Sequence, residues 1–330
     1  MTTRRFDVTA IGNAIVDVIA QAEDSLLAEH NLPKGAMNLI DAETAQKLYA
    51  IMGPGKEASG GSAGNTIAGI AALGGKAAYI GKVAADQLGE VFTHDIRAVG
   101  VTYDTTPLVG GLPTARSLIF VTPDAQRTMQ TFLGATTQLG PEDVNMDYIT
   151  SSKVVYLEGY LWDQPRAKKA MRDAAIKAQE SGAKVSLTLS DSFCVARFRD
   201  EFLELAEKHV DILFANENEI LSLYQTDNFD TALQQVRQHC EIAALTRSEK
   251  GSVVVNGNEV HVIDAVKGVK VVDTTGAGDA YAAGFLYAYT QGRDLATCGK
   301  LGGAMAAKVI SHFGPRSDVA DVKKIAASVL

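Results

Sequence analysis

The chain has 330 residues, of which 46% are hydrophobic and 21% charged, and its formal net charge is -8 with a pI near 5.3. This composition supplies enough apolar side chains for a large core and excludes disorder of the whole chain. The acidic balance gives no overall attraction to nucleic acid or to an anionic membrane, so we expect neither as a partner, and any phosphate binding must be local.

The cysteines and the first residues bear on where the protein works. Cys194, Cys240 and Cys298 are far apart in the sequence, which favours a reducing compartment over a disulfide framework. The histidines are scattered, and none has the spacing of a zinc site. No apolar run approaches the roughly 18 residues that cross a bilayer, and the chain begins directly with a strand-like segment. We expect a soluble, cytoplasmic protein.

Short apolar runs alternate with amphipathic stretches along most of the chain. Strands are predicted at residues 6–11, 77–80, 154–157, 185–189, 210–214 and 243–246. Helices are predicted between many of them, for example at residues 164–179, 197–209 and 219–224. Such repeated units build a mainly parallel sheet covered on both faces, so we predict an α/β fold, a three-layer α/β/α sandwich. Ligands of such sheets bind at the carboxyl ends of the strands.

Two regions depart from this alternation. Strand-like runs at 115–121 and 128–133 flank the turn 122–126, where Pro123 presets φ, and this predicts a hairpin. A further strand pair is predicted at 14–19 and 36–40. Together these segments could form a small β-sheet lid over the main sheet. We therefore predict a large unit of residues 1–12, 42–104 and 135–330 and a lid of residues 13–41 and 105–134.

The first polar positions of interest are Asn13 and Asp17, which lie in an otherwise apolar strand region. They are four residues apart and therefore face the same way on an extended chain. A carboxylate here can accept hydrogen bonds from the two adjacent hydroxyls of a ribose, while Asn13 and Asn65 position the sugar. The alternative is that Asp17 is an exposed acid of an edge strand.

Two motifs further along could serve a phosphate. Arg127, just after the hairpin turn, could reach over a bound phosphate as a lid cation, or be solvated surface. Asn216 and Glu219 follow a predicted strand and open a helix, where they form the pattern of a capping box. Capping alone would explain that pair.

The segment VVDTTGAGDAYAAGF, residues 271–285, indicates the chemistry of the protein more clearly than any other. From Gly276 onward the chain is predicted to be helical. Gly276, Ala277 and Gly278 have little or no side chain, so their amides can approach a phosphate at the positive end of a helix. Asp279, in the first turn, could take a proton from an attacking hydroxyl. The alternative is a glycine turn that only starts a helix. The segment lacks the third glycine of GxGxxG, and Gly53 to Lys56 lacks the spacing of a P-loop.

This segment resembles the C-terminal motif of the ribokinase-like family of carbohydrate and nucleoside kinases. The resemblance extends to the N-terminal glycine-rich motif GGSAGN, residues 60–65, and to the strand AAYIGKVAAD, and it covers essentially the whole chain. It implies that Asp279 is the catalytic base and that the backbone of Gly276, Ala277 and Gly278 is an anion hole. It also implies that Asp17, Gly61 and Asn65 contact the sugar, and that Asn216 and Glu219 organise Mg²⁺ and ATP phosphate, largely through water.

The resemblance also predicts the ATP and cation contacts. ATP is expected to meet Asn216, Thr246, Ser248, Gly251, Thr275 and Gly278. The family usually has glycine where Ser248 stands, which puts a close backbone contact there in doubt, although a serine hydroxyl could replace it. Activation by K⁺ is a weaker inference, with Asp273, Thr275, Ser311 and Gly314 as the residues that match a cation loop.

The acceptor is predicted from subfamily resemblance only. The segments VDILFANENE, LSDSF and YLEGYLW resemble the members of the family that phosphorylate adenosine at its 5′-hydroxyl to give AMP in purine salvage. Tyr160, Phe193, Met37 and Met129 would then line the purine pocket, with core packing as the alternative for the two methionines. A ribose or fructose kinase, an inosine or guanosine kinase, and a non-catalytic nucleoside-binding protein remain alternatives. The sequence leaves monomer and homodimer open.

Overall fold

The computed structural model of the chain describes residues 4–124 and 126–330. Within them a large sheet contains nine strands. These strands are β1 (Phe6–Ile11), β5 (Ala77–Ile80), β6 (Thr102–Tyr103), β9 (Ser152–Glu158), β10 (Lys184–Thr188), β11 (Ile212–Asn216), β12 (Ile242–Thr246), β13 (Ser252–Asn256) and β14 (Glu259–Ile263). Their order across the sheet is β14-β13-β12-β11-β10-β9-β1-β5-β6.

The large sheet is mainly parallel, as predicted. Neighbouring strands from β6 to β12 pair in parallel, whereas β13 and β14 pair antiparallel at one edge. The six strands predicted from apolar runs coincide with β1, β5, β9, β10, β11 and β12 to within two residues. Strands that are buried on both faces consist of continuous apolar residues, which explains why these six were recognisable.

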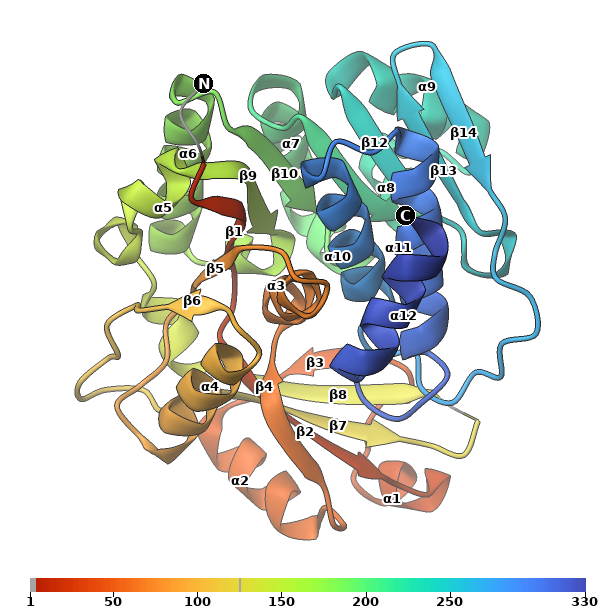
Figure 1. Cartoon of the computed structure of the whole chain (residues 1–330). Helices are drawn as coiled ribbons and strands as arrows, with labels where there is room; N and C mark the ends of the chain where they lie inside the picture. Colours follow the sequence, from red (N-terminus) through yellow and green to blue (C-terminus); the bar gives the residue numbers. More distant parts are fainter. Residues whose placement is uncertain (1–3, 125) are drawn as a thin grey trace.

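Helices cover both faces of the large sheet (Figure 1). One apolar core joins Val155 and Leu157 to the first set of helices, α5 (Met146–Thr150), α6 (Pro165–Glu180), α7 (Ser192–Lys208), α8 (Glu217–Tyr224) and α9 (Phe229–His239). A second core joins Val154 and Tyr156 to the other set, α3 (Ser62–Ala72), α4 (Gln87–Ala98), α10 (Ala277–Thr290), α11 (Leu295–Val309) and α12 (Val319–Val329). Because alternate residues of β9 enter opposite cores, the predicted three-layer α/β/α sandwich is confirmed.

A smaller sheet of five described strands lies across one end of the sandwich (Figure 1). Its strands are β2 (Ile15–Gln21), β3 (Met37–Leu39), β4 (Lys56–Gly60), β7 (Ala115–Val121) and β8 (Arg127–Phe132), in the order β3-β8-β7-β2-β4. The predicted hairpin is confirmed as β7 and β8, although Ala125 in its turn lies outside the described residues. Helices α1 (Asp24–Glu29) and α2 (Ala42–Ile51) pack on one face of the small sheet, where Leu27 and Leu48 meet Val18, Leu118 and Phe120.

Two predictions about the lid are corrected. The segments predicted as a strand pair, now β2 and β3, do not pair with each other, because the β7–β8 hairpin lies between them in the sheet. Residues 56–60, placed in the large unit by prediction, form β4, which pairs antiparallel with β2. The sequence KEASG has no apolar alternation that would have revealed a strand.

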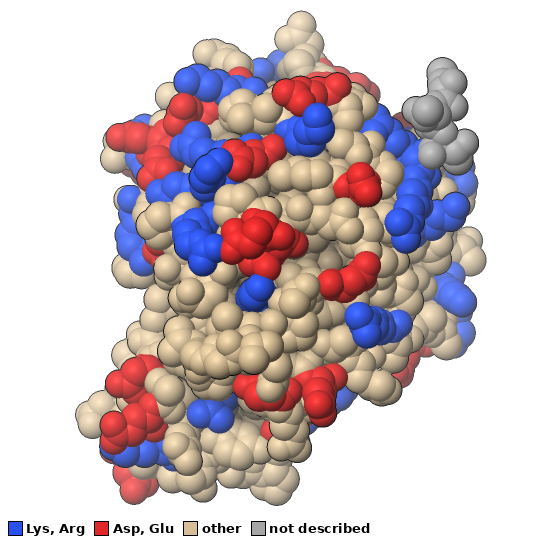
Figure 2. Space-filling model, turned by 90° about the vertical axis from the view of Figure 1, so that its left-hand side faces the viewer, with Lys and Arg blue, Asp and Glu red and all other residues tan. Residues whose placement is uncertain are grey.

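Two further observations concern the surface charges and the apolar character of the helices. Acidic and basic side chains are interspersed on the face shown in Figure 2. Among the described residues, none of the helices combines the length and the apolar character needed to cross a bilayer.

Candidate active site

The glycine turn before α10 presents a helix start without a side-chain cap, in which the amide of Ala277 makes a long hydrogen bond, 3.3 Å, to the carbonyl oxygen of Thr274. Gly276 is the N-cap and adopts the left-handed region with φ +76°, where an added Cβ would lie 2.8 Å from Pro315. Glycine has no side chain with which to cap the amides of the first turn. Gly278 is exposed, and a Cβ added there would meet none of the described atoms within 4 Å. The turn can therefore accept an anion.

Asp279 is held beside this turn by α3. Its Oδ1 accepts a hydrogen bond from the Ser62 hydroxyl at 2.7 Å, and its Oδ2 accepts one from Asn65 Nδ2 at 3.1 Å. Burial raises the pKa of Asp279, while these hydrogen bonds and the charges of Arg127 and Arg316 favour the ionised form. The predicted base is thus a half-buried carboxylate with fixed donors.

Arg127 reaches the glycine turn from the lid. It is the first residue of β8, and its Nη1 donates to the carbonyl oxygen of Thr274 at 3.1 Å. The side chain is therefore not a freely solvated surface arginine, which was the alternative. It places a cation next to the amides of the turn.

Asp17 is buried in the lid and is not an edge-strand acid. It is 5% exposed and lies on β2, which is flanked by β7 and β4. Burial raises its pKa to about 7, with Arg316 opposing this shift and Asp279 adding to it. A Cβ at Gly60 would lie 2.1 Å from the Asp17 carboxyl, and one at Gly61 2.2 Å from the carbonyl oxygen of Asn13. Because residues 60 and 61 have no side chain, the segment that leads into α3 can lie directly against β2.

The Asn13 side chain is engaged by a residue that sequence reasoning missed. Asn13 donates to Glu158 Oε1 from Nδ2 at 2.7 Å and from its backbone amide at 3.2 Å. Glu158 Oε2 accepts from the amide of Ala63 at 2.8 Å. Glu158 is 1% exposed, and burial raises its pKa to about 7. It ties the predicted sugar residue to the start of α3. Glu158 lies in the segment YLEGYLW, which was used for the subfamily resemblance without giving this acid a role.

Asn65 lies at the centre of the site. Its Nδ2 donates to Asp279, and its Oδ1 accepts from Arg316 Nε at 3.0 Å. Arg316 ends the segment 311–316 that resembles a cation loop, but no role in the acceptor site was predicted for it. The structure thus brings together Asn65, Asp279 and the lid acid Asp17, with Arg316 as their shared cation.

The residues predicted for the purine pocket come from two sides. Met37 and Met129 are opposite each other on β3 and β8 of the lid. Tyr160 follows β9, and its hydroxyl donates to the carbonyl oxygen of Ser190 at 3.3 Å. Phe193, after β10, is 63% exposed, with the Arg197 guanidinium 4.6 Å from its ring centre. Phe193 is not part of the core, whereas Met129 packs on the apolar cluster that contains Ile119.

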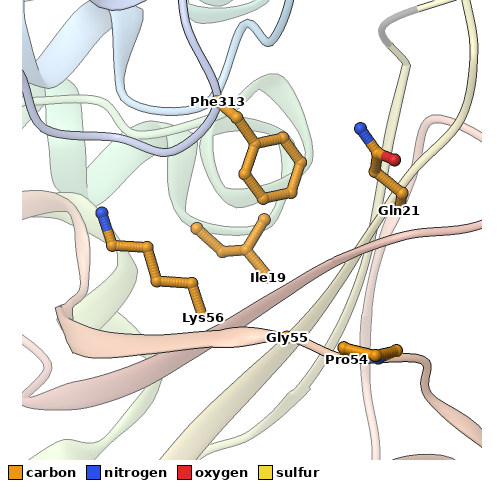
Figure 3. A pocket seen from close by; sticks show the side chains of 6 residues that line it. All are labelled: Ile19, Gln21, Pro54, Gly55, Lys56 and Phe313. Atoms are coloured by element: carbon orange, nitrogen blue, oxygen red, sulfur yellow. The ribbon is translucent and has the colours of Figure 1, made fainter.

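A hollow of about 510 Å³ opens between the lid and the loop after α11. Its lining residues are Ile19, Gln21, Pro54, Gly55, Lys56 and Phe313 (Figure 3). The Phe313 ring points toward Ile19, and both belong to an apolar cluster with Ile119 and Val121. Ile19 and Gln21 share the face of β2 that carries Asp17. The loop after α11 therefore contacts the lid next to the predicted sugar site.

The start of α8 is closed by its own side chains. Asn216 Oδ1 accepts from the amide of Glu219 at 2.9 Å, and Glu219 Oε2 accepts from the amide of Asn216 at 2.9 Å. The capping box is therefore present. Glu219 is 5% exposed, and burial raises its pKa to about 7, with the charge of Asp191 adding to the shift.

A cation near Glu219 and Asp191 would have to take most of its ligands from water and substrate. In the described ranges no three His, Cys, Asp or Glu side chains converge on one point as metal ligands. Mg²⁺ usually keeps several waters and takes the rest of its ligands from substrate phosphates. Asp191, the N-cap of α7, was not predicted to take part.

The predicted ATP loop contains two residues in the left-handed region. Ser248 has φ +51° and Gly251 has φ +82°, and a Cβ on Gly251 would lie 2.0 Å from the carbonyl oxygen of Ile263. The conformation at Ser248 is one that glycine adopts readily, which gives a physical reason for the glycine of the resembling family. Thr246 pairs with Asn216 across β12 and β11, so this loop lies beside the start of α8.

The residues predicted to hold K⁺ are partly brought together. Asp273 Oδ1 accepts from the amide and the hydroxyl of Thr275 at 2.8 and 2.6 Å, and Oδ2 accepts from the amide of Gly314 at 2.9 Å. The Ser311 hydroxyl instead donates to the carbonyl oxygen of Lys308. Asp273 fastens the loop after α11 to the glycine turn, and the cation site stays a prediction.

Comparisons with known proteins show the family and the fold of this chain. The sequence matches the family model "pfkB family carbohydrate kinase" over residues 35–321. A solved adenosine kinase from Sinorhizobium meliloti is 58% identical, with a TM-score of 0.95, covering 99% of this chain and 100% of that chain. A probable sugar kinase from Rhizobium etli CFN 42 is 56% identical, with a TM-score of 0.94 and the same coverage. The adenosine kinase of Saccharomyces cerevisiae is 29% identical over 339 residues, covering 93% of this chain and 96% of that protein. The predicted ribokinase-like α/β fold is confirmed.

Proposed function

Because this chain belongs to the pfkB family of carbohydrate kinases, we propose that it transfers the γ-phosphate of ATP to the 5′-hydroxyl of adenosine, giving AMP and ADP. The observation that carries the proposal is a carboxylate, Asp279, held by two hydrogen-bond donors beside a helix start without a side-chain cap. Sequence identity of 58% with an adenosine kinase supports the choice of acceptor. The expected role of the reaction is purine salvage.

The proposed transfer is direct. Asp279 accepts the proton of the 5′-hydroxyl, the resulting oxygen forms a bond to the γ-phosphorus, and the bond from that phosphorus to the bridging oxygen of ADP breaks. The hydroxyl of Ser62 and the amide of Asn65 fix both oxygens of the Asp279 carboxylate. The base is thereby aimed before the substrate arrives, which lowers the reorganisation needed during transfer.

Stabilisation of the moving phosphate is assigned to the turn and the lid. The amides of Gly276, Ala277 and Gly278 would bind the anion at the positive end of α10, that of Ala277 in place of its long hydrogen bond to the Thr274 carbonyl oxygen, and Arg127 adds a full charge. Mg²⁺, when bound near Glu219 through water, would offset the negative charge of the ATP phosphates. A lid that excludes water would also limit wasteful hydrolysis of ATP.

Recognition of the acceptor is assigned to the two sheets together. Asp17, buried on β2, would accept hydrogen bonds from the ribose diol, and the exposed ring of Phe193 with Tyr160 and the two lid methionines would contact the purine. A sugar kinase is the second candidate, because a relative named as a probable sugar kinase is 56% identical. A single coupled assay with adenosine, inosine, guanosine, ribose and fructose separates these acceptors. ATP consumption excludes a protein that only binds nucleosides.

The base role is tested by Asp279→Asn. We expect kcat to fall about 1,000-fold or more, because general-base catalysis contributes roughly 10²–10⁴ and this variant cannot take the proton. Adenosine affinity, measured by calorimetry, should change by no more than a few-fold. The matched control is Asp294→Asn, another acid at a helix start, which caps α11 by accepting from Thr297. Turnover near wild type in Asp279→Asn would remove Asp279 from this role.

A further inference from the structure

Arg316 lies in the loop after α11, two residues beyond Gly314, and its side chain reaches into the acceptor site and not toward Asp273. Its Nε donates to Asn65 Oδ1 at 3.0 Å, and its Nη1 donates to Ser59 Oγ at 2.7 Å. The carboxylate of Asp95 lies 3.6 Å from Nη1, and the side chain is 18% exposed. A single guanidinium therefore joins α3, the end of lid strand β4 and α4.

We propose that Arg316 is a positioning residue, which fixes the Asn65 amide so that Nδ2, and not Oδ1, faces the base Asp279. The inference rests on the proposed role of Asp279. It assigns a function in the reaction to an arginine that is 251 residues from Asn65 in the sequence.

The argument follows from the donors and acceptors of the three groups. A guanidinium can only donate, so the atom of Asn65 that faces Arg316 must be the carbonyl oxygen. The opposite atom is then Nδ2, which donates to Asp279 Oδ2 at 3.1 Å. If the amide were reversed, its oxygen would face a carboxylate oxygen and its NH₂ would face the guanidinium, and both contacts would be repulsive. Arg316 thus removes the freedom of the amide to turn over.

The guanidinium is itself anchored by the lid. Asp95 Oδ2 accepts from the amide and from the hydroxyl of Ser59, both at 2.7 Å, and Ser59 Oγ then accepts from Arg316. Arg316 Nη2, by contrast, is buried and has no hydrogen-bond partner in the part of the chain that is described. A purely structural arginine would be expected to satisfy each of its buried N–H groups. The arrangement is built around the two nitrogens that reach Asn65 and Ser59.

Removal of Arg316 should change the protonation of the base. The charged or titratable groups that face Asp279 from the elements around it are Arg127 on β8, Arg316, Asp17 on β2, and Tyr156 and Glu158 on β9. Arg316 is one of two cations among them, against two other carboxylates. Without it the proton on Asp279 is held more tightly, and the carboxylate loses an oriented donor, so the base becomes available only at higher pH.

The first test is Arg316→Met, with kcat/KM measured from pH 5 to 9. We expect kcat/KM to fall at least tenfold at pH 7 and the acid limb to move to higher pH by about one unit. Arg172→Met is the control, because Arg172 makes ion pairs with Glu201 and Glu204 on the outer helices. This control should keep the wild-type profile. A merely structural role for Arg316 would lower stability without moving the acid limb.

The second test is a double-mutant cycle with Asn65→Ala. At a pH above the acid limbs of all variants, where the direct effect of the Arg316 charge on Asp279 no longer changes the rate, adding Arg316→Met to Asn65→Ala should cost little further activity if Arg316 acts through Asn65, whereas independent effects would multiply. Should Arg316→Met fail to fold, Arg316→Lys replaces it, since one ammonium nitrogen cannot serve Asn65 and Ser59 as the guanidinium does. An unmoved acid limb or a multiplicative cycle overturns the inference. These outcomes are distinct from the failure of the base proposal, which shows itself as an active Asp279→Asn.

Discussion

The starts of α10 and α8 differ in how the amides of the first turn are satisfied. At α8 the capping box of Asn216 and Glu219 satisfies amides of the first turn with the chain's own side chains. At α10 the N-cap is Gly276, and Gly278 in the first turn is exposed. A helix start without a side-chain cap, next to a carboxylate with fixed donors, indicates a binding site for an anionic ligand. A helix start that is capped by its own side chains has fewer free amides for an anion, and its carboxylate can meet a ligand.

The turn before α10 and the loop beside α8 also differ in the residue type that adopts the left-handed backbone conformation. The α10 turn uses glycine at φ +76°, where a Cβ would also collide with Pro315. The loop beside α8 uses Ser248 at φ +51°, a conformation that is unfavourable for a residue with a Cβ. This comparison suggests three substitutions: one in the α10 turn, one at the start of α8 and one in the loop beside α8.

The largest effect is expected from placing a charge in the open turn with Gly278→Asp. A Cβ at this position has open space around it, and an acid in the first turn of a helix is stabilising, so the melting temperature should be unchanged or higher. The new carboxylate would occupy the proposed phosphate site, and kcat/KM should fall at least about 100-fold. Parallel thermal melts and coupled assays measure both quantities.

Gly303→Asp serves as the control for Gly278→Asp, because Gly303 on α11 is another helical glycine whose added Cβ would meet no described atom within 4 Å. It should retain wild-type kcat/KM. Full activity in Gly278→Asp would show that the turn does not hold the phosphate.

How far these features could be predicted depends on whether their signals are local. The six parallel strands and the glycine turn with Asp279 were predicted, because each is a contiguous run with a recognisable pattern. Strand β4 was missed because its residues, Lys56–Gly60, show no apolar alternation, and its role depends on pairing with β2. The packing that defines the lid is therefore only partly encoded in local sequence.

The prediction of site residues also depended on local sequence signals. Asp17 and Asn65 were given roles from their motifs. Glu158, Asp191 and Arg316 also lie in segments with a family resemblance, but no role was predicted for them, because they act on residues outside those segments. Glu158, for example, binds Asn13, which is 145 residues away. No pattern within a single window of sequence could indicate such a contact, and the chain's acidic balance gives no hint of one buried arginine among carboxylates.

A moderate effect is expected at the closed helix start from Glu219→Gln. Burial raises the pKa of Glu219 from 4.5 to about 7, so between these values the folded protein holds a proton that the unfolded chain has lost. The free energy of unfolding should therefore decrease as pH rises through this window, by up to about 1.4 kcal/mol per pH unit from this group. Glutamine does not titrate and should flatten the slope, as measured by urea unfolding at pH 5, 6 and 7.

Glu217→Gln provides the comparison for Glu219→Gln, because the adjacent Glu217 pairs with Arg247 near the surface and its pKa is lowered. That variant should leave the decline between pH 5 and 7 in place. A slope in Glu219→Gln equal to that of the wild type would mean that the carboxyl is ionised throughout the window in the folded protein.

The smallest effect is expected from Ser248→Gly, which gives the loop beside α8 the residue type found at the α10 turn. Relief of the left-handed strain should raise the free energy of unfolding by up to about 1 kcal/mol, partly offset by the greater freedom of glycine in the unfolded chain. Ser222→Gly, in the middle of α8, should instead lower it. If the serine hydroxyl serves ATP, the KM for ATP should rise in Ser248→Gly while the protein becomes more stable. An unchanged KM for ATP would show that the loop needs only the backbone conformation, and that serine is merely tolerated there.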